Sequence, residues 1–431
     1  MSRIDYIADR NADDAKNEFI TRLVKAKDEL VAFVEVRMGW EKLGKAHQFF
    51  RGSFNISLVV ENMQTFERVL IRFPLRGSVY GPWRDEKVKN EVMALQYISE
   101  KTNIPVPQVY HWGMTEASPM SLGPFIIEEF KEGEDLHGLL KKPTDDEKIG
   151  SILDPNIPDP KLDFVYESET DGKWHVVGRP LTYDMNEVAT VCGFPVDQFE
   201  VTEPFNSASD YFHYRAHCLQ TSLMTQRNLW EKDTTIMWNR FIARHCLPKL
   251  IPTYLSSENQ GPFRLYCDDM RPLNMLADPV SLRITAVVDL EFTNAMPAQY
   301  AHDLPWWLTL EEPGISIEED KEAFLSRFEP RKEQFLGAME RVERKCSPFE
   351  PGEQALSARM RDSWNTGRFW FNLASRSTLE VEEIYWKMLH KDGLGEAVLD
   401  PAILAEKQAF LKLKRRQIDE YFADKNRDDR S

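Results

Sequence analysis

The sequence lacks the cysteine patterns of a disulfide-stapled or zinc-binding protein. Its five cysteines are odd in number, scattered over 431 residues and never arranged as C-x-x-C (Cys192, Cys218, Cys246, Cys267 and Cys346). This pattern is typical of reduced thiols in a cytosolic protein. We therefore expect a cytoplasmic location.

An excess of positive charge and long apolar segments are also missing. The chain has 54 basic and 70 acidic residues, a net charge of −16. Nucleic acids and anionic membranes attract basic faces, so neither is expected as the main partner. No apolar run approaches the roughly 18 residues that span a bilayer, and the first residues include acids that targeting segments avoid. The acidic balance would suit a cationic ligand, although solubility explains it equally well.

The short motifs of common hydrolases and P-loop nucleotide-binding proteins do not occur either. The sequence contains no G-x-S-x-G, no H-E-x-x-H and no G-x-x-x-x-G-K-[S/T]. What it does contain is material for a packed core, because 42% of the residues are hydrophobic and these include 11 Trp and 25 Phe. Such a composition excludes an intrinsically disordered chain.

The segment 265–292 carries the most informative combination of side chains. It has an Asp (Asp269), an Asn five residues later (Asn274) and a second Asp at the end of an apolar strand (Asp289). Phosphoryl transfer from Mg-ATP uses one carboxylate to accept or orient the proton of the acceptor hydroxyl. An amide oxygen and another carboxylate hold the metal ion. The alternative is a buried turn with Asn and Asp caps.

This segment resembles the catalytic region of the aminoglycoside phosphotransferase-like and choline kinase-type branch of the protein-kinase-like superfamily. There, His-Gly-Asp-x-x-x-x-Asn precedes an apolar strand and Asp-[Trp/Leu]-Glu. The resemblance implies that Asp269 is the catalytic base and that Asn274 and Asp289 bind Mg²⁺. Arg271 would stabilise charge at the γ-phosphate or, alternatively, is a surface arginine paired with an acid. The chain looks most like a fungal subgroup of that family.

Two positions depart from the family pattern. Cys267 and Asp268 stand where the family has His and Gly. The His usually supports the loop, so its loss concerns loop geometry more than chemistry, and Asp268 has no assigned role. Related folds place a later Asp against the backbone of the catalytic loop, a supporting role that falls to Asp303. His302 has no second ligand at a useful spacing and is expected to be a core or surface histidine.

The order of expected elements matches an α+β, protein-kinase-like fold of two lobes. Residues 1–46 form a helical extension that packs on the next lobe. Residues 47–136 form a small antiparallel-sheet lobe with one main helix, in the order three strands, helix, two strands. Residues 137–431 form a larger, mostly helical lobe. It includes an insertion at 137–205, with a hairpin around 170–172, and C-terminal helices at 315–425.

Capping patterns suggest where two helices of the larger lobe begin. Asp184 and Glu187 have the spacing of a capping box, and Ser207 begins a long helix by the same logic.

The small lobe supplies the candidates for nucleotide binding. Gly52 and Ser53 lie where kinases cover the phosphates, although any β-turn would explain them. Arg72 on the third strand and Glu91 on the helix match the kinase ion pair that fixes the phosphates; the alternative is two surface charges. Glu129 and Phe130 match the lobe-connecting hinge that binds adenine through its backbone, or else an ordinary edge strand.

Together these features predict an ATP- and Mg²⁺-dependent phosphotransferase. Its acceptor would be a hydroxyl of a small molecule, for which an aminoglycoside, a choline-like amine, a sugar or a secondary metabolite all remain open. Asp289 is followed by Leu-Glu rather than Phe-Gly, and no Ala-Pro-Glu segment follows, which disfavours a protein kinase. The altered loop, the arginine in place of lysine and the single glycine leave a second hypothesis open, a nucleotide-binding or interaction module without turnover.

Overall fold

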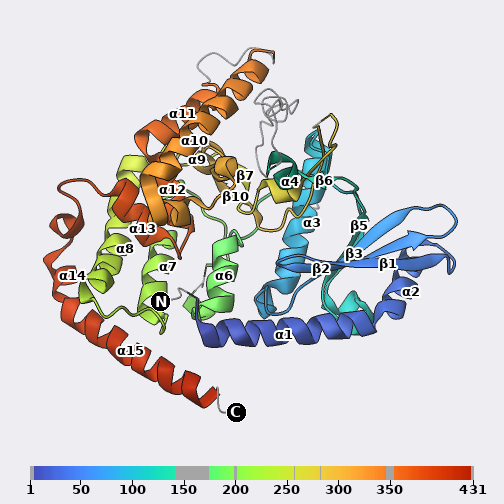
Figure 1. Ribbon diagram of the computed structural model, residues 1–431, viewed down its shortest axis with the longest axis horizontal. Coiled ribbons are helices and arrows are strands. Elements are labelled where there is room, and N and C mark those ends of the chain that lie inside the picture. Colours follow the sequence, from blue (N-terminus) through green and yellow to red (C-terminus); the bar gives the residue numbers. More distant parts are fainter. Residues whose placement is uncertain are drawn as a thin grey trace.

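The computed structural model describes residues 4–141, 174–198, 201–256, 258–281, 283–345 and 354–428. Figure 1 shows a strand-rich lobe joined to a larger helical lobe, the predicted two-lobe α+β architecture. The hairpin predicted around residues 170–172 lies outside the described residues. In the described part of the chain, every helix is too short or too polar to cross a bilayer.

The small lobe is built on a five-stranded antiparallel sheet with the spatial order β1-β2-β3-β5-β4. Its strands and its main helix follow the predicted sequence order, with β1 beginning three residues earlier than expected. The elements are β1 (Gly44–Arg51), β2 (Asn55–Asn62), β3 (Arg68–Pro74), α3 (Arg84–Lys101), β4 (Val109–Gly113) and β5 (Phe125–Glu129).

The two faces of this sheet have different coverings because side chains alternate along each strand. One face packs against α1 (Tyr6–Lys25) and α2 (Lys27–Met38), as expected for the N-terminal extension. Phe19, Leu23 and Leu30 of these helices share a core with strand residues such as Leu58 and Ile71. The opposite face, with Asn55, Ser57, Val59 and Arg72, is directed towards α3 and the larger lobe.

The larger lobe is a packed set of helices around an aromatic core. Phe212, Phe241, Phe328 and Phe371 are fully buried within it. The Ser207 hydroxyl accepts a hydrogen bond from the Asp210 amide and begins a helix, as predicted. The helices are α7 (Ala208–Thr225), α8 (Thr234–Tyr254), α9 (Ala298–Ala301), α10 (Pro313–Glu343), α11 (Leu356–Thr366), α12 (Arg368–Arg376), α13 (Val381–Ile384), α14 (Pro401–Ala405) and α15 (Lys407–Asp428).

Short elements lie where the lobes meet, and they carry the candidate site. The two-stranded sheet is β10-β7, and the three-stranded sheet is β6-β8-β9. The helix α6 begins after Thr182, whose hydroxyl caps it, so the predicted capping role of Asp184 is wrong. These elements are α4 (Leu136–Lys141), α6 (Tyr183–Val191), β6 (Glu134–Asp135), β7 (Phe263–Cys267), β8 (Met275–Ala277), β9 (Ile284–Val287) and β10 (Thr293–Pro297).

Candidate active site between the lobes

Strand pairing brings the loop with Asp269 next to the segment with Asp289. Asp269 lies on the loop between β7 and β8, as the sequence predicted. The loop ends in one turn of 3₁₀ helix, Pro272–Asn274. Since β8 pairs with β9, the amide of Val288 donates to the carbonyl of Asn274 at 2.9 Å. The backbones of Asn274 and Asp289 therefore lie side by side on two neighbouring segments.

The side chains of Asn274 and Asp289 keep oxygen atoms that fit a magnesium ion. Asn274 donates through Nδ2 to the carbonyl oxygen of Asp269 at 2.8 Å, which leaves its amide oxygen for another partner. Oδ1 of Asp289 accepts from Arg72 at 2.9 Å and from Asn55 at 3.1 Å. The second carboxylate oxygen has no hydrogen bond from the described residues, and 33% of this side chain is exposed. Carboxylate and amide oxygens are the ligands that Mg²⁺ prefers.

Asp269 is a buried carboxyl group close to the guanidinium of Arg271. Its Oδ1 lies 3.1 Å from Nε of Arg271. Burial raises the pKa of Asp269 to about 6, an effect that the Arg271 guanidinium opposes and the Asp289 carboxylate strengthens. At neutral pH the group is mainly ionised and can accept a proton. The contact with Asp269 fits the alternative for Arg271, an arginine paired with an acid, and its role at the γ-phosphate stays a prediction.

Arg72 and Glu91 form the predicted pair, and both are buried. Arg72 donates to Glu91 at 2.5 Å from Nη2 and to Asp289 from Nη1. Its Nε lies 3.4 Å from Glu128, a residue that sequence reasoning missed. Burial raises the pKa of Glu128 to about 7, against the influence of the Arg72 guanidinium. The arginine thus links two small-lobe acids to the proposed metal-binding carboxylate.

The turn between β1 and β2 holds Gly52 and Ser53 at the surface. The Gly52 amide donates to the carbonyl of Asn55 at 2.9 Å. A Cβ atom at Gly52 would meet only that carbonyl oxygen, at 3.6 Å, and the backbone there needs no positive φ. A simple β-turn accounts for this geometry, so contact of Gly52 and Ser53 with phosphates stays a prediction. The next residues, Phe54 and Asn55, are the ones that reach the centre.

A cavity of about 430 Å³ lies beside the predicted hinge. Val59 of β2 and Leu276 of β8 line it from the two lobes, and Phe130 and Phe50, whose rings stack at 6.0 Å, line it as well. These apolar side chains suit a flat heterocycle. The rest of the lining is mainly polar: His47, Gln48, Arg68, Lys131 and Glu132. The cavity lining includes Phe130 but not Glu129.

The amides of both predicted hinge residues already have acceptors, Gln108 for Glu129 and Arg68 for Phe130. An adenine in the cavity would therefore bond to carbonyl groups or to the 131–133 segment. The hinge role of these two residues stays a prediction.

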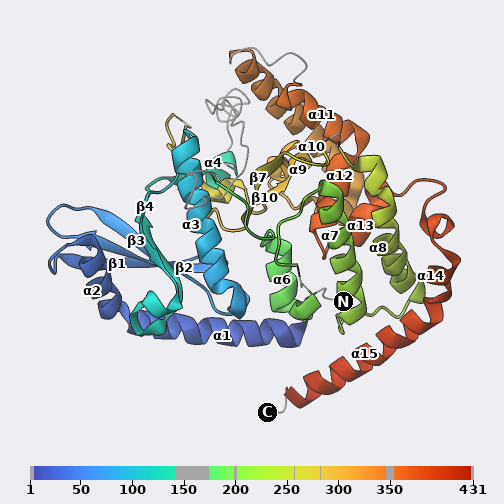
Figure 2. The same cartoon turned by 180° about the vertical axis from the view of Figure 1, so that it is seen from behind.

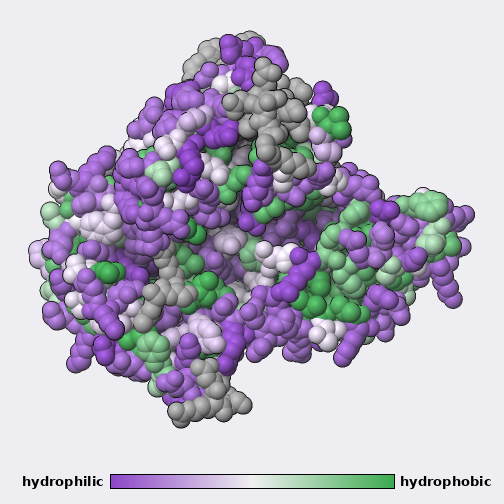
Figure 3. All heavy atoms as spheres, viewed as in Figure 1, coloured by the Kyte–Doolittle hydropathy of each residue, from purple (hydrophilic) through white to green (hydrophobic). Residues whose placement is uncertain are grey.

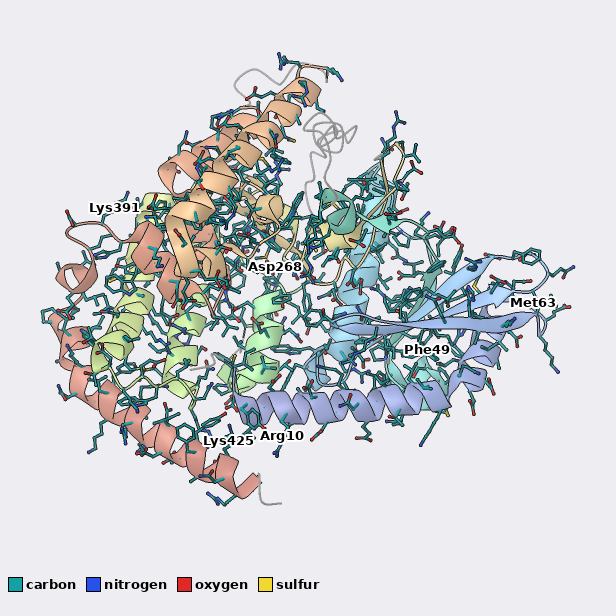
Figure 4. The ribbon with its side chains drawn as sticks, viewed as in Figure 1. Arg10, Phe49, Met63, Asp268, Lys391 and Lys425 are labelled. Atoms are coloured by element: carbon teal, nitrogen blue, oxygen red, sulfur yellow. The ribbon has the colours of Figure 1, made fainter. Side chains whose placement is uncertain are left out.

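A second cavity, of about 480 Å³, reaches Asp269 from the larger lobe. Tyr183 and Trp306 line it, and Figure 3 shows the surface hollowed between the lobes. Asp268, labelled at the centre of Figure 4, lies in its wall. Acids outnumber bases among the lining residues: Asp184, Glu187, Asp268, Asp269, Glu312, Glu318 and Glu380 face only Arg271 and Arg376.

Several acids of this second cavity lie close enough to raise one another's pKa. Burial raises the pKa of Glu187 to about 8, and the carboxylates of Asp184, Glu380 and Glu312 raise it further. Asp184 is committed elsewhere, because it binds Arg215 and accepts from the Thr378 amide at 2.6 Å. The Glu187 end of the cavity therefore gathers several carboxyl groups, and a bound cation would favour their ionised forms by lowering their raised pKa values.

Asp268 ties the catalytic loop to its surroundings. Its Oδ2 accepts from the amide of Tyr183 at 3.3 Å, and its Oδ1 lies 3.4 Å from Nη1 of Arg376. Burial raises the pKa of Asp268, and the Arg376 guanidinium opposes this. In this chain the residue at the family's glycine position therefore connects the loop to α6 and α12.

Two expectations about residues 302–303 have different outcomes. Asp303 accepts from Asn372 at 2.9 and 3.0 Å and from Ser363, so it supports helices of the large lobe. This confirms its predicted supporting role, although its described hydrogen bonds are to these helices and the predicted partner, the catalytic-loop backbone, is wrong. His302 is buried next to Arg359, at 3.2 Å, and burial lowers its pKa to about 4. This confirms a core histidine.

Behind Asp289, sequence reasoning missed Lys87 and gave no role to Glu291, the Glu of the Asp-Leu-Glu sequence. Lys87 of α3 lies 3.2 Å from Oδ1 of Asn55 and forms an ion pair with Glu291. Nδ2 of Asn55 donates to Glu291 at 2.8 Å. For Lys87 the sequence offers the four-residue spacing to Glu91, a spacing that exposed helix faces also show.

Comparison with solved structures finds similarity at low sequence identity. No protein-family model and no curated protein matches the sequence. A protein described as an aminoglycoside phosphotransferase from Ralstonia eutropha has a TM-score of 0.45 and 12% identity, over 91% of this chain and 98% of that chain. Choline kinase from Cryptosporidium parvum gives 0.43 and 13%, over 91% and 97%. A microcompartment-associated aminopropanol kinase gives 0.43 and 12%, over 91% and 98%.

The expected fungal subgroup stays a prediction.

Proposed function

We propose that this chain is an ATP- and Mg²⁺-dependent phosphotransferase that acts on a hydroxyl group of a small molecule. The observation that carries the proposal is the convergence of Asp269, Asn274 and Asp289 between the lobes, with Arg72 bonded to Asp289. One cavity lies beside the hinge, and a separate one reaches Asp269. Two cavities suit a reaction with two substrates, a nucleotide and an acceptor.

Each side chain of the centre has a task in this reaction. Asp269 accepts or orients the proton of the acceptor hydroxyl while the oxygen attacks the γ-phosphorus and the bond to the β-phosphate oxygen breaks, which yields ADP and a phosphate ester. Asn274 and Asp289 would hold Mg²⁺, which offsets the charge of the phosphate oxygens. Arg72, held by Glu91 and Asp289, would contact phosphate oxygens through its guanidinium.

The acidic cavity favours a cationic acceptor, such as a hydroxylated amine. Glu187, Glu312 and Glu380 lie near each other, and acids outnumber the two arginines, Arg271 and Arg376, among the described residues of the cavity wall. The aromatic rings of Tyr183 and Trp306 add faces that attract an ammonium group. The hydroxyl of such a molecule would lie at Asp269 and its ammonium at Glu187.

Phosphorus NMR with ATP and Mg²⁺ tests this function. The purified protein is incubated with hydroxylated amines, with neutral sugars and with casein as a protein acceptor, and an Asp269→Asn variant serves as the control. We expect a new phosphate-ester signal with one or more amines and no such signal in the control. Esters formed only on casein would contradict a small-molecule kinase.

A nucleotide-binding module without turnover is the second candidate. Oδ1 of Asp289 is already bonded to Arg72 and Asn55, and Cys267-Asp268 replaces the usual His-Gly. ATP binding without ester formation on any acceptor, including the hydroxylated amines, would favour this candidate over the enzyme.

A further inference from the structure

A buried cluster of three polar side chains joins the lobes directly behind Asp289. Asn55 comes from β2, Lys87 from α3 and Glu291 from the segment that follows β9. Lys87 pairs with Glu291, and both contact Asn55, at 3.2 and 2.8 Å. The side chain of Lys87 is 1% exposed and that of Glu291 is 0% exposed. Neither can reach a ligand in either cavity, so any effect on a ligand must pass through a neighbour.

Asn55 is the neighbour through which they can act. Its amide oxygen accepts from Lys87, which directs its Nδ2 towards the two acids. That nitrogen donates to Glu291 and, at 3.1 Å, to Oδ1 of Asp289. The lysine therefore fixes the orientation of the amide. The amide in turn engages one oxygen of Asp289 and leaves the other towards the centre.

The backbone of the 289–292 turn has an unusual conformation that neighbouring side chains must stabilise. Asp289 and Phe292 both have a φ of +59°, a left-handed conformation that is unusual for an aromatic residue. The ring of Phe292 packs against Phe54 at 5.3 Å and lies 5.8 Å from the ammonium of Lys87. The same lysine thus contacts both ends of the 289–292 turn, through Asn55 and through the ring of Phe292.

This cluster is expected to stabilise the fold less than apolar side chains of similar size would. Burying a lysine and a glutamate costs more than burying an apolar pair of similar size. One oxygen of Glu291, Oε1, is also buried without a hydrogen-bond partner among the described residues. A core selected only for stability would place apolar side chains here, so the charges point to a positioning role.

We propose that Lys87 and Glu291 are positioning residues that hold Asn55, and through it Asp289, in the orientation that binds Mg²⁺ with the nucleotide. The inference rests on the proposed function. In this role Glu291, the second acid of the Asp-Leu-Glu sequence, holds the side chains of Lys87 and Asn55 from the small lobe.

The test is calorimetric binding of a nonhydrolysable ATP analogue in excess Mg²⁺ and in EDTA. The main variant is Lys87→Met combined with Glu291→Leu, which leaves no unpaired charge in the core. Lys89→Met, an exposed lysine of the same helix, is the matched control. Lys87→Arg, which keeps the charge, tests for rescue. Circular dichroism and thermal melting confirm folding of each variant.

In excess Mg²⁺ we expect the double variant to bind the analogue about 10- to 100-fold more weakly than the wild type does. This is the range found for residues that orient metal ligands. Affinity in EDTA should stay unchanged, Lys89→Met should match the wild type, and Lys87→Arg should recover part of the loss. A folded double variant with the full magnesium effect would overturn the inference and leave the proposed function standing. A wild-type protein that binds the analogue without any magnesium effect would overturn both.

Discussion

At the scale of single residues, the central group is Asp269, whose carboxyl is buried and near one arginine. Replacing it with Asn keeps the size of the side chain and removes the proton acceptor. We expect transfer to the acceptor to fall by about 10²- to 10⁴-fold, the usual contribution of a general base. ATP binding should remain, because Asp269 is not among the proposed metal ligands. Product formation and calorimetric ATP binding on the same preparation check this. Unchanged turnover would remove Asp269 from the mechanism.

Glu187 gives a pH dependence of stability with a defined sign. Its pKa rises from an ordinary 4.5 to about 8 on folding. The folded protein therefore holds this proton more tightly than the unfolded chain, and the free energy of unfolding falls as pH rises between these values. Glu187→Gln should make that decline shallower. Urea unfolding at pH 5, 7 and 9 measures it, with the exposed Glu319→Gln as control. Identical slopes in wild type and Glu187→Gln would be inconsistent with a raised pKa.

The site residues that could be predicted from the sequence are those that belong to a short motif or to a fixed order of elements. Asp269, Asn274 and Asp289 follow a short motif, and Arg72 with Glu91 follows the order of strand and helix. Lys87 and Glu128 were missed because a charged residue in an amphipathic element usually faces water, and burial depends on the packing of distant segments. Asp303 was assigned the wrong partner for the same reason, since Ser363 and Asn372 lie far away in the sequence.

At the scale of elements, α6 forms a wall of the acidic cavity and is held from both ends. The carbonyl of Val191 at its last residue accepts from the Asp5 amide at 2.8 Å. Before its first turn, the backbone of Leu181 exchanges two hydrogen bonds with Asn294 of β10, at 2.8 and 2.9 Å. Asn186 in the helix bonds to the backbone of Ser78 and Tyr80 in the small lobe.

Removing the Asn294 side chain should loosen α6. Asn294→Ala leaves two buried backbone groups of Leu181 without partners, and each unsatisfied group costs about 1–3 kcal/mol. We expect the free energy of unfolding to fall by about 2–6 kcal/mol in urea titrations, since the two losses add. The exposed Asn103→Ala should change it by less than about 0.5 kcal/mol. Equal effects of the two substitutions would show that Asn294 does not anchor α6.

The sheet order could be predicted from sequence because strand and helix periodicities are local signals. Exact boundaries could not, and β1 starts at Gly44 because its pairing extends to Asn62 across the hairpin. The start of α6 was misplaced because the hydroxyl of Thr182, rather than the carboxylate of Asp184, meets the free amide of Met185. Asp184 is instead drawn into an ion pair with Arg215 from another helix.

At the scale of the whole molecule, α1 links the two lobes. Figures 1 and 2 show it lying along one side of the protein, from the larger lobe to the far side of the sheet. At its start, the Tyr6 amide donates to the hydroxyl of Tyr421 in α15 at 2.9 Å, and Ile4 lines the acidic cavity. Further along, Phe19 and Leu23 enter the core of the small lobe.

Gly77 controls how closely α1 approaches the small lobe. It has a φ of +84°, and a Cβ atom there would lie 1.9 Å from the carbonyl oxygen of Ala12. Gly77→Ala should lower the free energy of unfolding by more than about 2 kcal/mol, because the left-handed backbone alone costs roughly 1–2 kcal/mol. Gly81→Ala, where a Cβ atom meets open space, is the control and should be nearly neutral. Equal thermal unfolding of both variants would contradict this docking of α1.

The most direct test of the account is calorimetric titration of ATP into the wild-type protein and into Asp289→Ala, with and without Mg²⁺. The account predicts magnesium-dependent binding to the wild type and loss of the magnesium effect in the variant, because Asp289 supplies the carboxylate for the metal. The contradicting result is a wild-type protein that shows no binding at millimolar ATP, or one whose ATP affinity ignores both magnesium and the substitution.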